Sequence, residues 1–265
     1  MLPLLSGADQ QPVGQPAPSP PSGNQGLTGL ASEASRLLDD PRVAAQVLAA
    51  AKDEALRRCA TDGWFWTSFV KTRDEADVES VKAFPRLEYL RELWQVLEAN
   101  QRIAIAKSRQ MMVSWLLCVY CVWFARFHAN RYVIWQSQKK EDAQAMVCMP
   151  KDAGDAGGYL ARMQFIETNL PSWMRLNVRE SAGSLDYPNG SRIEAVAGGA
   201  NQVRGKTASL LVEDEFAHQE EAKGVYQAVG PLIQKATRFV AISTPNGPDN
   251  TFAEIYHGYK LVNID

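Results

Sequence analysis

The sequence has no overall excess of one charge, and it has few cysteines. It contains 28 Lys and Arg against 30 Asp and Glu, a formal net charge of -2, so any nucleic-acid contact has to come from a local basic patch. The four cysteines, Cys59, Cys118, Cys121 and Cys148, make no disulfide framework. Cys118 and Cys121 have C-x-x-C spacing but lie in an apolar helical pattern, and we interpret them as buried thiols rather than as a zinc or redox site.

The sequence also lacks an apolar run long enough to cross a bilayer. The run that begins at Trp115 is shorter than the roughly 20 residues that a membrane-spanning helix needs, and Arg126 interrupts it. The N-terminus shows no charged segment followed by an apolar one, so we expect no secretory signal peptide. We therefore predict no membrane partner.

The composition is that of a globular protein with a tail. The 265 residues are 46% hydrophobic and 22% charged, enough for one large domain or two small ones. Residues 1–30 are rich in Pro, Gly and Ser, which predicts a disordered tail. Residues 31–100 are predicted to be an N-terminal helical segment, with a helix start at Asp40-Pro41. Its aromatic cluster, Trp64 to Phe69, is typical of a core but also of one wall of an adenine pocket.

From 101 to 260 apolar β-like segments alternate with helical patterns, which predicts an α/β fold with a mainly parallel β-sheet flanked by helices. In such sheets the working residues lie at the carboxyl ends of the strands. A hairpin is predicted around the Asn-Gly turn at Asn189. Core strands are predicted at 103–106, 131–135, 209–212 and 238–242.

The stretch AKSRQMMVSW follows the first of these strands and begins the next helix. Strand, cationic loop and helix start can hold a phosphate, because backbone N–H groups and the positive end of the helix dipole face the anion. The common signature G-x-x-x-x-G-K-[ST] is met only at Ser114, since Met112 and Val113 replace Gly and Lys. By itself the stretch is equally an ordinary strand–helix turn. The candidate nucleotide-binding residues are Lys107, Ser108, Arg109, Gln110, Met111, Met112, Val113 and Ser114.

Three carboxylates, Glu213, Asp214 and Glu215, follow the apolar strand that starts near Ser209. Adjacent acids repel one another, which makes a purely structural reason for them hard to find. At a strand end beside a phosphate, one carboxylate can hold hydrated Mg2+ while the next polarises the attacking water. The alternative is a solvated acidic turn.

Two further loops carry candidate residues. Ser243 and Thr244 end a core strand, where their hydroxyls can contact a γ-phosphate or its water, although a Pro-Asn-Gly turn follows them. Arg204 lies beside Gly205 and can project its guanidinium from a tight turn. Each loop taken alone is also compatible with an ordinary surface turn.

In this order the four stretches resemble the large subunit of tailed-phage terminases, specifically its N-terminal packaging ATPase domain. KSRQMMVS is similar to that family's variant Walker A loop, in which some members place the lysine at the start, where Lys107 stands. VEDEFA resembles the Walker B strand, and STPNG resembles the coupling motif. Arg204 stands ten residues before Asp214, like the family's proposed arginine finger. The resemblance covers about Phe65 to Tyr259.

The resemblance implies a P-loop NTPase-like core at 101–260 that uses ATP and Mg2+ to drive double-stranded DNA into a procapsid. It implies a homo-oligomeric ring, a capsid portal and a small terminase subunit as partners, in the cytoplasm of the bacterial host. The implied roles are metal binding by Ser114 and Asp214, catalysis by Glu215 and Arg204, and coupling by Ser243 and Thr244.

The departures from the family pattern lead to further expectations. Met112 in place of glycine predicts a loop less free to adopt positive φ, and Glu213 adds a charge where an apolar residue is commoner. We expect the family's C-terminal nuclease domain to be absent from this chain, and no nuclease activity from it. Two alternatives stay open: a helicase-like nucleic-acid-dependent ATPase, and a degenerate P-loop module that binds nucleotide or DNA without hydrolysis, which Val113 favours.

Overall fold

The computed structural model describes residues 40–73, 81–108, 111–137, 158–181, 183–234 and 237–258. The predicted tail, Cys148 and two predicted phosphate-loop residues, Arg109 and Gln110, lie outside these ranges. The chain divides into two compact units, residues 1–51 and 52–265, and the division at 30 and 100 drawn from the sequence stays a prediction.

Helix α2 (Pro41–Thr61) begins where the sequence predicts. Its first residue is a proline, which needs no N–H partner there and has the φ of a helix. The Arg42 N–H donates to Asp40 Oδ1 over 2.8 Å, so the Asp40 side chain satisfies one of the free donors of the first turn. The signals at this terminus therefore act as an Asp-Pro helix start.

A seven-stranded β-sheet forms the centre of residues 52–265. Its first five strands in spatial order are parallel, and the last two extend it as an antiparallel meander. The predicted α/β class with a mainly parallel sheet is confirmed. The order is β3 (Arg102–Ala106), β9 (Arg238–Ser243), β8 (Leu210–Glu213), β4 (Tyr132–Ser137), β7 (Arg192–Ala197), β6 (Ser184–Asp186) and β5 (Arg179–Ser181).

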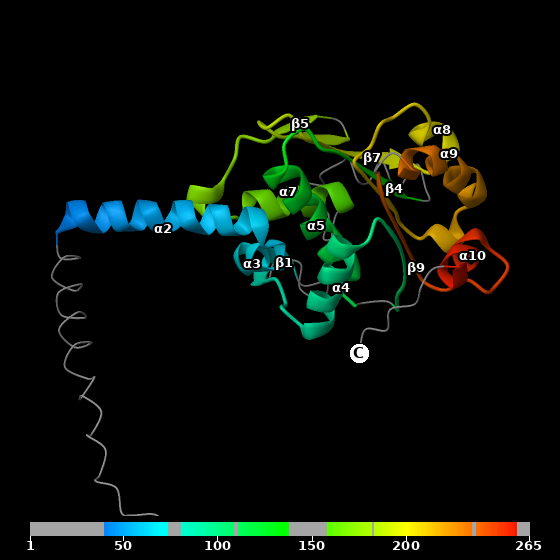
Figure 1. The fold of residues 1–265 in the computed structure, drawn as a ribbon, viewed down its shortest axis with the longest axis horizontal. Coiled ribbons are helices and arrows are strands. Elements are labelled where there is room, and N and C mark those ends of the chain that lie inside the picture. Colours follow the sequence, from blue (N-terminus) through cyan, green and yellow to red (C-terminus); the bar gives the residue numbers. More distant parts are fainter. Residues whose placement is uncertain are drawn as a thin grey trace, which may run out of the picture. The chain divides into compact units, whose positions relative to one another are not determined.

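Helices cover both faces of this sheet. Side chains alternate along each strand, so that Val133 and Trp135 of β4 belong to one buried cluster while Ile134 between them belongs to the other. The helices of the first face lie on one side of the sheet in Figure 1 and those of the second on the other. They are α4 (Glu88–Ala99), α5 (Val113–Phe127) and α7 (Tyr159–Thr168) on the first face, and α8 (Ala200–Val203), α9 (Ala222–Gln234) and α10 (Thr251–Gly258) on the second.

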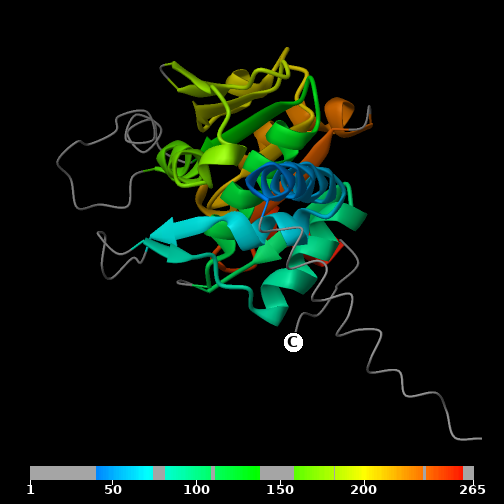
Figure 2. The same ribbon diagram turned by 90° about the vertical axis from the view of Figure 1, so that its left-hand side faces the viewer.

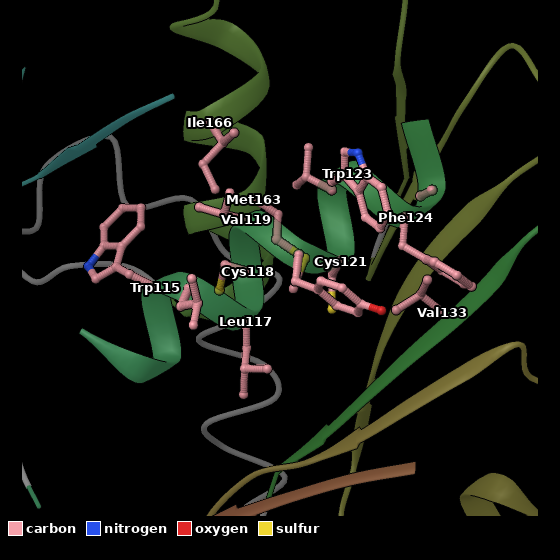
Figure 3. Close-up of a cluster of buried hydrophobic side chains, with 14 of the residues drawn as sticks. Trp115, Leu117, Cys118, Val119, Cys121, Trp123, Phe124, Val133, Met163 and Ile166 are labelled. Atoms are coloured by element: carbon pink, nitrogen blue, oxygen red, sulfur yellow. The ribbon is translucent and has the colours of Figure 1, made fainter. Parts of the chain in front are cut away.

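Helix α5 is buried almost all round, which explains why its sequence has no polar face. It lies between Val133 of the sheet and Met163 and Ile166 of α7 (Figure 3). Cys118 and Cys121 are buried free thiols within this packing, and burial raises the pKa of Cys118 to about 12. No group of three or more potential metal-binding His, Cys, Asp or Glu side chains occurs in the described residues. This supports the interpretation of the pair as buried thiols.

The aromatic cluster after α2 packs as core. It lies on α3 (Gly63–Trp66) and the 3₁₀ turn η1 (Thr67–Phe69), and Trp66 is fully buried with its ring edge-on to Phe127, centroids 5.4 Å apart. The Trp64 ring packs against Trp94 at 6.4 Å. A fully buried Trp66 has no free face for a base, so the adenine-wall alternative is not supported.

Four short elements were not predicted. Strands β1 (Lys71–Arg73) and β2 (Val81–Ala83) pair as a separate two-stranded sheet, which Figure 2 shows in cyan apart from the yellow-green strands of the large sheet. Strand β5 and the 3₁₀ turn η2 (Ser172–Met174) are the others. These strands have three residues each, too few for a periodic pattern.

Two predicted boundaries are corrected. The helix predicted at 219–229 is α9, which starts at Ala222 and continues past Pro231 to Gln234. The flexible loop predicted at 197–200 is shorter, since Ala197 still belongs to β7 and Ala200 already starts α8. None of the described helices is both long and apolar enough to cross a membrane.

Gly63 should be intolerant of any side chain, because a Cβ there would meet the Trp94 ring and lie 2.8 Å from Trp123 Cε2. We expect Gly63→Ala to lower the free energy of unfolding by about 1–3 kcal/mol, the usual cost of overpacking. The matched control is Gly224→Ala in α9, whose Cβ would lie 3.7 Å from Ala200 Cβ, an ordinary contact. Equal midpoints of urea unfolding for the two variants would refute the close approach.

Candidate functional site

The predicted site residues lie at the carboxyl edge of the parallel strands. Strands β3, β9 and β8 are adjacent, and Ala106 at the end of β3 pairs with Ser243 at the end of β9. The Lys107 N–H then donates to the Ser243 carbonyl over 3.0 Å. The start of the predicted phosphate loop is therefore fixed to the end of the predicted coupling strand.

Lys107 and Glu215 form an ion pair at this edge. Lys107 Nζ lies 2.9 Å from Glu215 Oε1, although the two residues are 108 positions apart. The Lys107 side chain is 10% exposed and that of Glu215 31%. Because both are partly withdrawn from water, their attraction is screened less than that of a surface pair.

The second oxygen of Glu215 is held by β9. Glu215 Oε2 accepts hydrogen bonds from the Thr244 N–H at 3.2 Å and the Thr244 hydroxyl at 3.1 Å, with the Ser243 hydroxyl at 3.4 Å. Burial raises the pKa of Glu215, but the hydrogen bond and charge of Lys107 and the two bonds from Thr244 outweigh burial and lower it overall. Glu215 is therefore an ionised carboxylate with both oxygens occupied.

Asp214 lies in a different environment. It is 1% exposed, and burial raises the pKa of Asp214 to about 6, against the effect of a Tyr159 hydrogen bond and of the Lys107 charge. Asp214 Oδ1 has no hydrogen-bond partner among the described residues. An unpartnered carboxylate oxygen in a buried site suits a hard cation such as Mg2+, which takes oxygen ligands.

Glu213 does not add the third charge expected from the sequence. Its side chain is fully buried, and Gln219 Nε2 donates to Glu213 Oε2 over 3.1 Å. Burial raises the pKa of Glu213 to about 8, so the carboxyl is largely neutral at pH 7. Alternate residues of a strand face opposite sides of a sheet, which explains why Glu213 and Asp214 have separate surroundings.

The described part of the phosphate loop turns sharply into α5. Met112 has φ 54° and ψ 6° and directly precedes the helix, so the residue expected to disfavour positive φ adopts it. The Tyr89 hydroxyl donates to the Met111 carbonyl over 3.1 Å, and the Met112 carbonyl accepts from the Leu116 N–H at 2.9 Å. The turn is thus fixed on both sides of the strained residue.

The other described loop residues differ in accessibility. Ser108 and Met111 are exposed, whereas Val113 is buried in the core and points no charge at the loop. Ser114 is partly buried in the first turn of α5, and its hydroxyl has no hydrogen-bond partner within the described ranges. Together with the unpartnered oxygen of Asp214, this hydroxyl makes a donor set that fits Mg2+.

Arg204 is not part of this cluster. It is exposed on the loop after α8, and its guanidinium donates to Asn201 Oδ1 over 3.3 Å. No described contact joins it to Glu215. The neighbouring Lys206 is paired with Glu194 at 2.9 Å, so Arg204 is the arginine of this turn whose side chain faces solvent.

His218 belongs to the site, and the sequence reasoning missed it. It ends the 3₁₀ turn η3 (Phe216–His218) after β8, and its Nε2 lies 3.0 Å from the Thr244 hydroxyl oxygen. Its position three residues after Glu215, at the end of an apolar strand, was a signal available in the sequence. Its partner Thr244 could not be read from the sequence alone.

No protein-family model matches the sequence. The structure is similar to the large terminase ATPase domain of Thermus phage P74-26, with TM-score 0.47 and 17% identity over 65% of this chain and 69% of that one. It is also similar to the HK97 bacteriophage large terminase, with TM-score 0.49 and 9% identity over 66% of this chain and 36% of that one. For the large terminase of a thermophilic bacteriophage in complex with ADP, the values are 0.44, 14%, 61% and 38%.

These similar structures are large terminases, the family that the motifs in the sequence resemble. At such identities the similarity concerns the fold. The chain spans 36% of the length of the HK97 protein and 38% of that of the ADP-bound terminase.

Met112 should distinguish substitutions by their backbone preference. A left-handed conformation costs an ordinary residue about 1–2 kcal/mol and a β-branched residue the most, whereas Asn tolerates it. We therefore expect Met112→Val to be about 1–2 kcal/mol less stable than Met112→Asn in chemical unfolding. Both variants lose the thioether, so each is the packing control of the other. Equal stability would mean that Met112 does not hold positive φ in solution.

Proposed function

We propose that this chain is the ATP-hydrolysing motor subunit of a phage DNA-packaging terminase. The observation that carries the ATPase part is the contact between Lys107 and Glu215, with Thr244 on the other oxygen of Glu215. Three segments far apart in the sequence thereby meet at the carboxyl edge of a parallel sheet, where α/β proteins bind ligands. A purely structural strand–helix turn needs no such convergence.

In this proposal each residue has one task. Lys107 and the N–H groups of Ser108 to Ser114, with Arg109, bind the phosphates of ATP at the start of α5. Ser114 and Asp214 hold Mg2+, which supplies charge neutralisation at the phosphate oxygens. Glu215 accepts the proton of the attacking water.

The Lys107–Glu215 pair is the resting state of the site in this proposal. An occupied Glu215 with a lowered pKa is a poor general base. When Lys107 moves to the phosphates, Glu215 loses the partner that lowers its pKa most, and it becomes a stronger base. The site is thus active only when nucleotide competes for Lys107.

The packaging role rests on the order of the sequence motifs. The proposed partners are double-stranded DNA, other copies of this chain in a ring, a capsid portal and a small terminase subunit, in the host cytoplasm. A helicase-like ATPase would unwind a forked duplex, and a degenerate module would show no single-turnover hydrolysis. Stimulation of the ATPase by a portal-bearing procapsid distinguishes the packaging motor from both.

Lys107→Ala and Glu215→Gln should fail at different steps. Lys107→Ala loses a phosphate contact, so it should weaken ATP binding and turnover together. Glu215→Gln keeps the shape but loses the base, so it should bind ATP and lower kcat by about 10²–10⁴-fold. Binding is measured with a fluorescent ATP analogue, and turnover by phosphate release in a single turnover.

The exposed residues Lys223 and Glu254 provide matched controls. Lys223→Ala and Glu254→Gln remove the same charges elsewhere on the chain and should leave both quantities unchanged. Normal turnover by Glu215→Gln would assign the base to another carboxylate and overturn the mechanism.

Arg204 should act on the ATP of a neighbouring subunit. It is exposed and away from the Lys107–Glu215 pair of its own chain, and an arginine finger contributes roughly 10³–10⁵ in rate. Arg204→Ala and Glu215→Gln chains, each inactive alone, should partly restore ATPase activity when mixed under conditions of assembly. In a mixed ring the Arg204→Ala subunit keeps Glu215 and receives an arginine from its neighbour.

The control mixture combines two Glu215→Gln preparations, which contain no intact base and should stay inactive. If mixed rings form, as shown by co-purification of differently tagged chains, and no ratio restores activity, Arg204 serves its own site or is only part of a basic surface turn.

A further inference from the structure

We propose that His218 is a positioning residue for Glu215 and acts through the Thr244 hydroxyl. This inference rests on the proposed ATPase function and adds a residue to its machinery. His218 Nε2 lies 3.0 Å from Thr244 Oγ1, which lies 3.1 Å from Glu215 Oε2. The direct distance from His218 Nε2 to Glu215 Oε2 is 3.9 Å, so the hydroxyl is the link between the two groups.

Counting protons fixes the direction of both hydrogen bonds. An ionised carboxylate only accepts, and the pKa of Glu215 is lowered, so the Thr244 hydroxyl must donate its one proton to Glu215. The Thr244 oxygen then has only lone pairs to offer the imidazole. His218 therefore donates from Nε2, and Nε2 carries a proton.

The backbone around this relay leaves little else to be fixed. The Ala217 N–H donates to Ser243 Oγ over 3.1 Å, and Asn246 Nδ2 donates to the Ala217 carbonyl over 3.1 Å. These two bonds hold η3 against the end of β9. The rotation of the Thr244 hydroxyl remains, and the donor on His218 restricts it to the orientation that bonds Glu215.

This restriction matters most when Lys107 leaves. Glu215 then keeps only the contacts from Ser243 and Thr244. A hydroxyl fixed by His218 keeps Oε2 in place, so that Oε1 faces the water in a defined orientation. His218 itself touches neither the phosphate nor the water and is therefore a positioning residue.

The protonation of His218 can be measured without ATP. The chain has three histidines, so comparison with His218→Gln assigns the imidazole signals in a long-range 1H–15N spectrum of the full chain. We expect a proton on Nε2 of His218, and a change in its Nε2 shift in Thr244→Val. An Nε2 without a proton would overturn the inference, whether or not the chain hydrolyses ATP.

The kinetic test compares His218→Leu with His218→Gln. The Gln amide can place an N–H near the position of Nε2, whereas Leu removes the donor. We expect His218→Leu to lower kcat about 5- to 10-fold, the effect of one lost hydrogen bond, with ATP binding and KM nearly unchanged. His218→Gln should recover most of the loss.

The control variant is His257→Leu, which removes an exposed histidine of α10 and should leave kcat unchanged. In a Thr244→Val background, His218→Leu should cost nothing further, because the link is already absent. A loss in kcat that Gln does not recover, an additive loss in the double variant, or an effect on KM alone would each overturn the positioning role. A wild-type chain without ATPase activity would instead refute the proposed function and leave the spectroscopic result standing.

Discussion

The parallel pairing of β3, β9 and β8 is the constraint on which the site depends. It brings three chain ends to one edge, and the Lys107 N–H continues the ladder by one bond beyond β3 to the Ser243 carbonyl. The positions of Lys107, Glu215 and Thr244 follow from this register. A shift by one residue would turn each strand's side chains to the opposite face, and the ion pair could not form.

Burial then divides the three carboxylates into three states. Glu213 faces the α9 side and is largely neutral, because burial raises its pKa and a single Gln219 bond does not offset this. Asp214 faces the other side with one oxygen unpartnered, and Glu215 leaves the strand and is ionised between Lys107 and Thr244. Three adjacent acids in the sequence are therefore compatible, since their mutual repulsion is relieved by direction and by protonation.

The sequence predicted the parts of the fold that repeat a pattern over many residues. The apolar runs of β3, β4, β8 and β9 and the amphipathic stripe of α4 could be read directly. The exposed strands β1, β2 and β5 could not, because three residues give no period. The site was predicted as separate candidates at strand ends, whereas the neutral state of Glu213 and the contact of His218 depend on Gln219 packing and on the β8–β9 neighbourhood.

Two strained backbone positions flank the ion pair. Met112 and Glu215 have φ 54° and 48°, and they are two of the three non-glycine residues with positive φ in the described ranges. Left-handed residues of this kind cost roughly 1–3 kcal/mol and persist where the surroundings fix them. At Glu215 the left-handed turn directs the carboxylate to Lys107 and Thr244 instead of continuing β8, and at Met112 it starts α5 directly after the loop. The fold thus maintains strain at the two turns that aim the proposed base and the proposed phosphate site at each other.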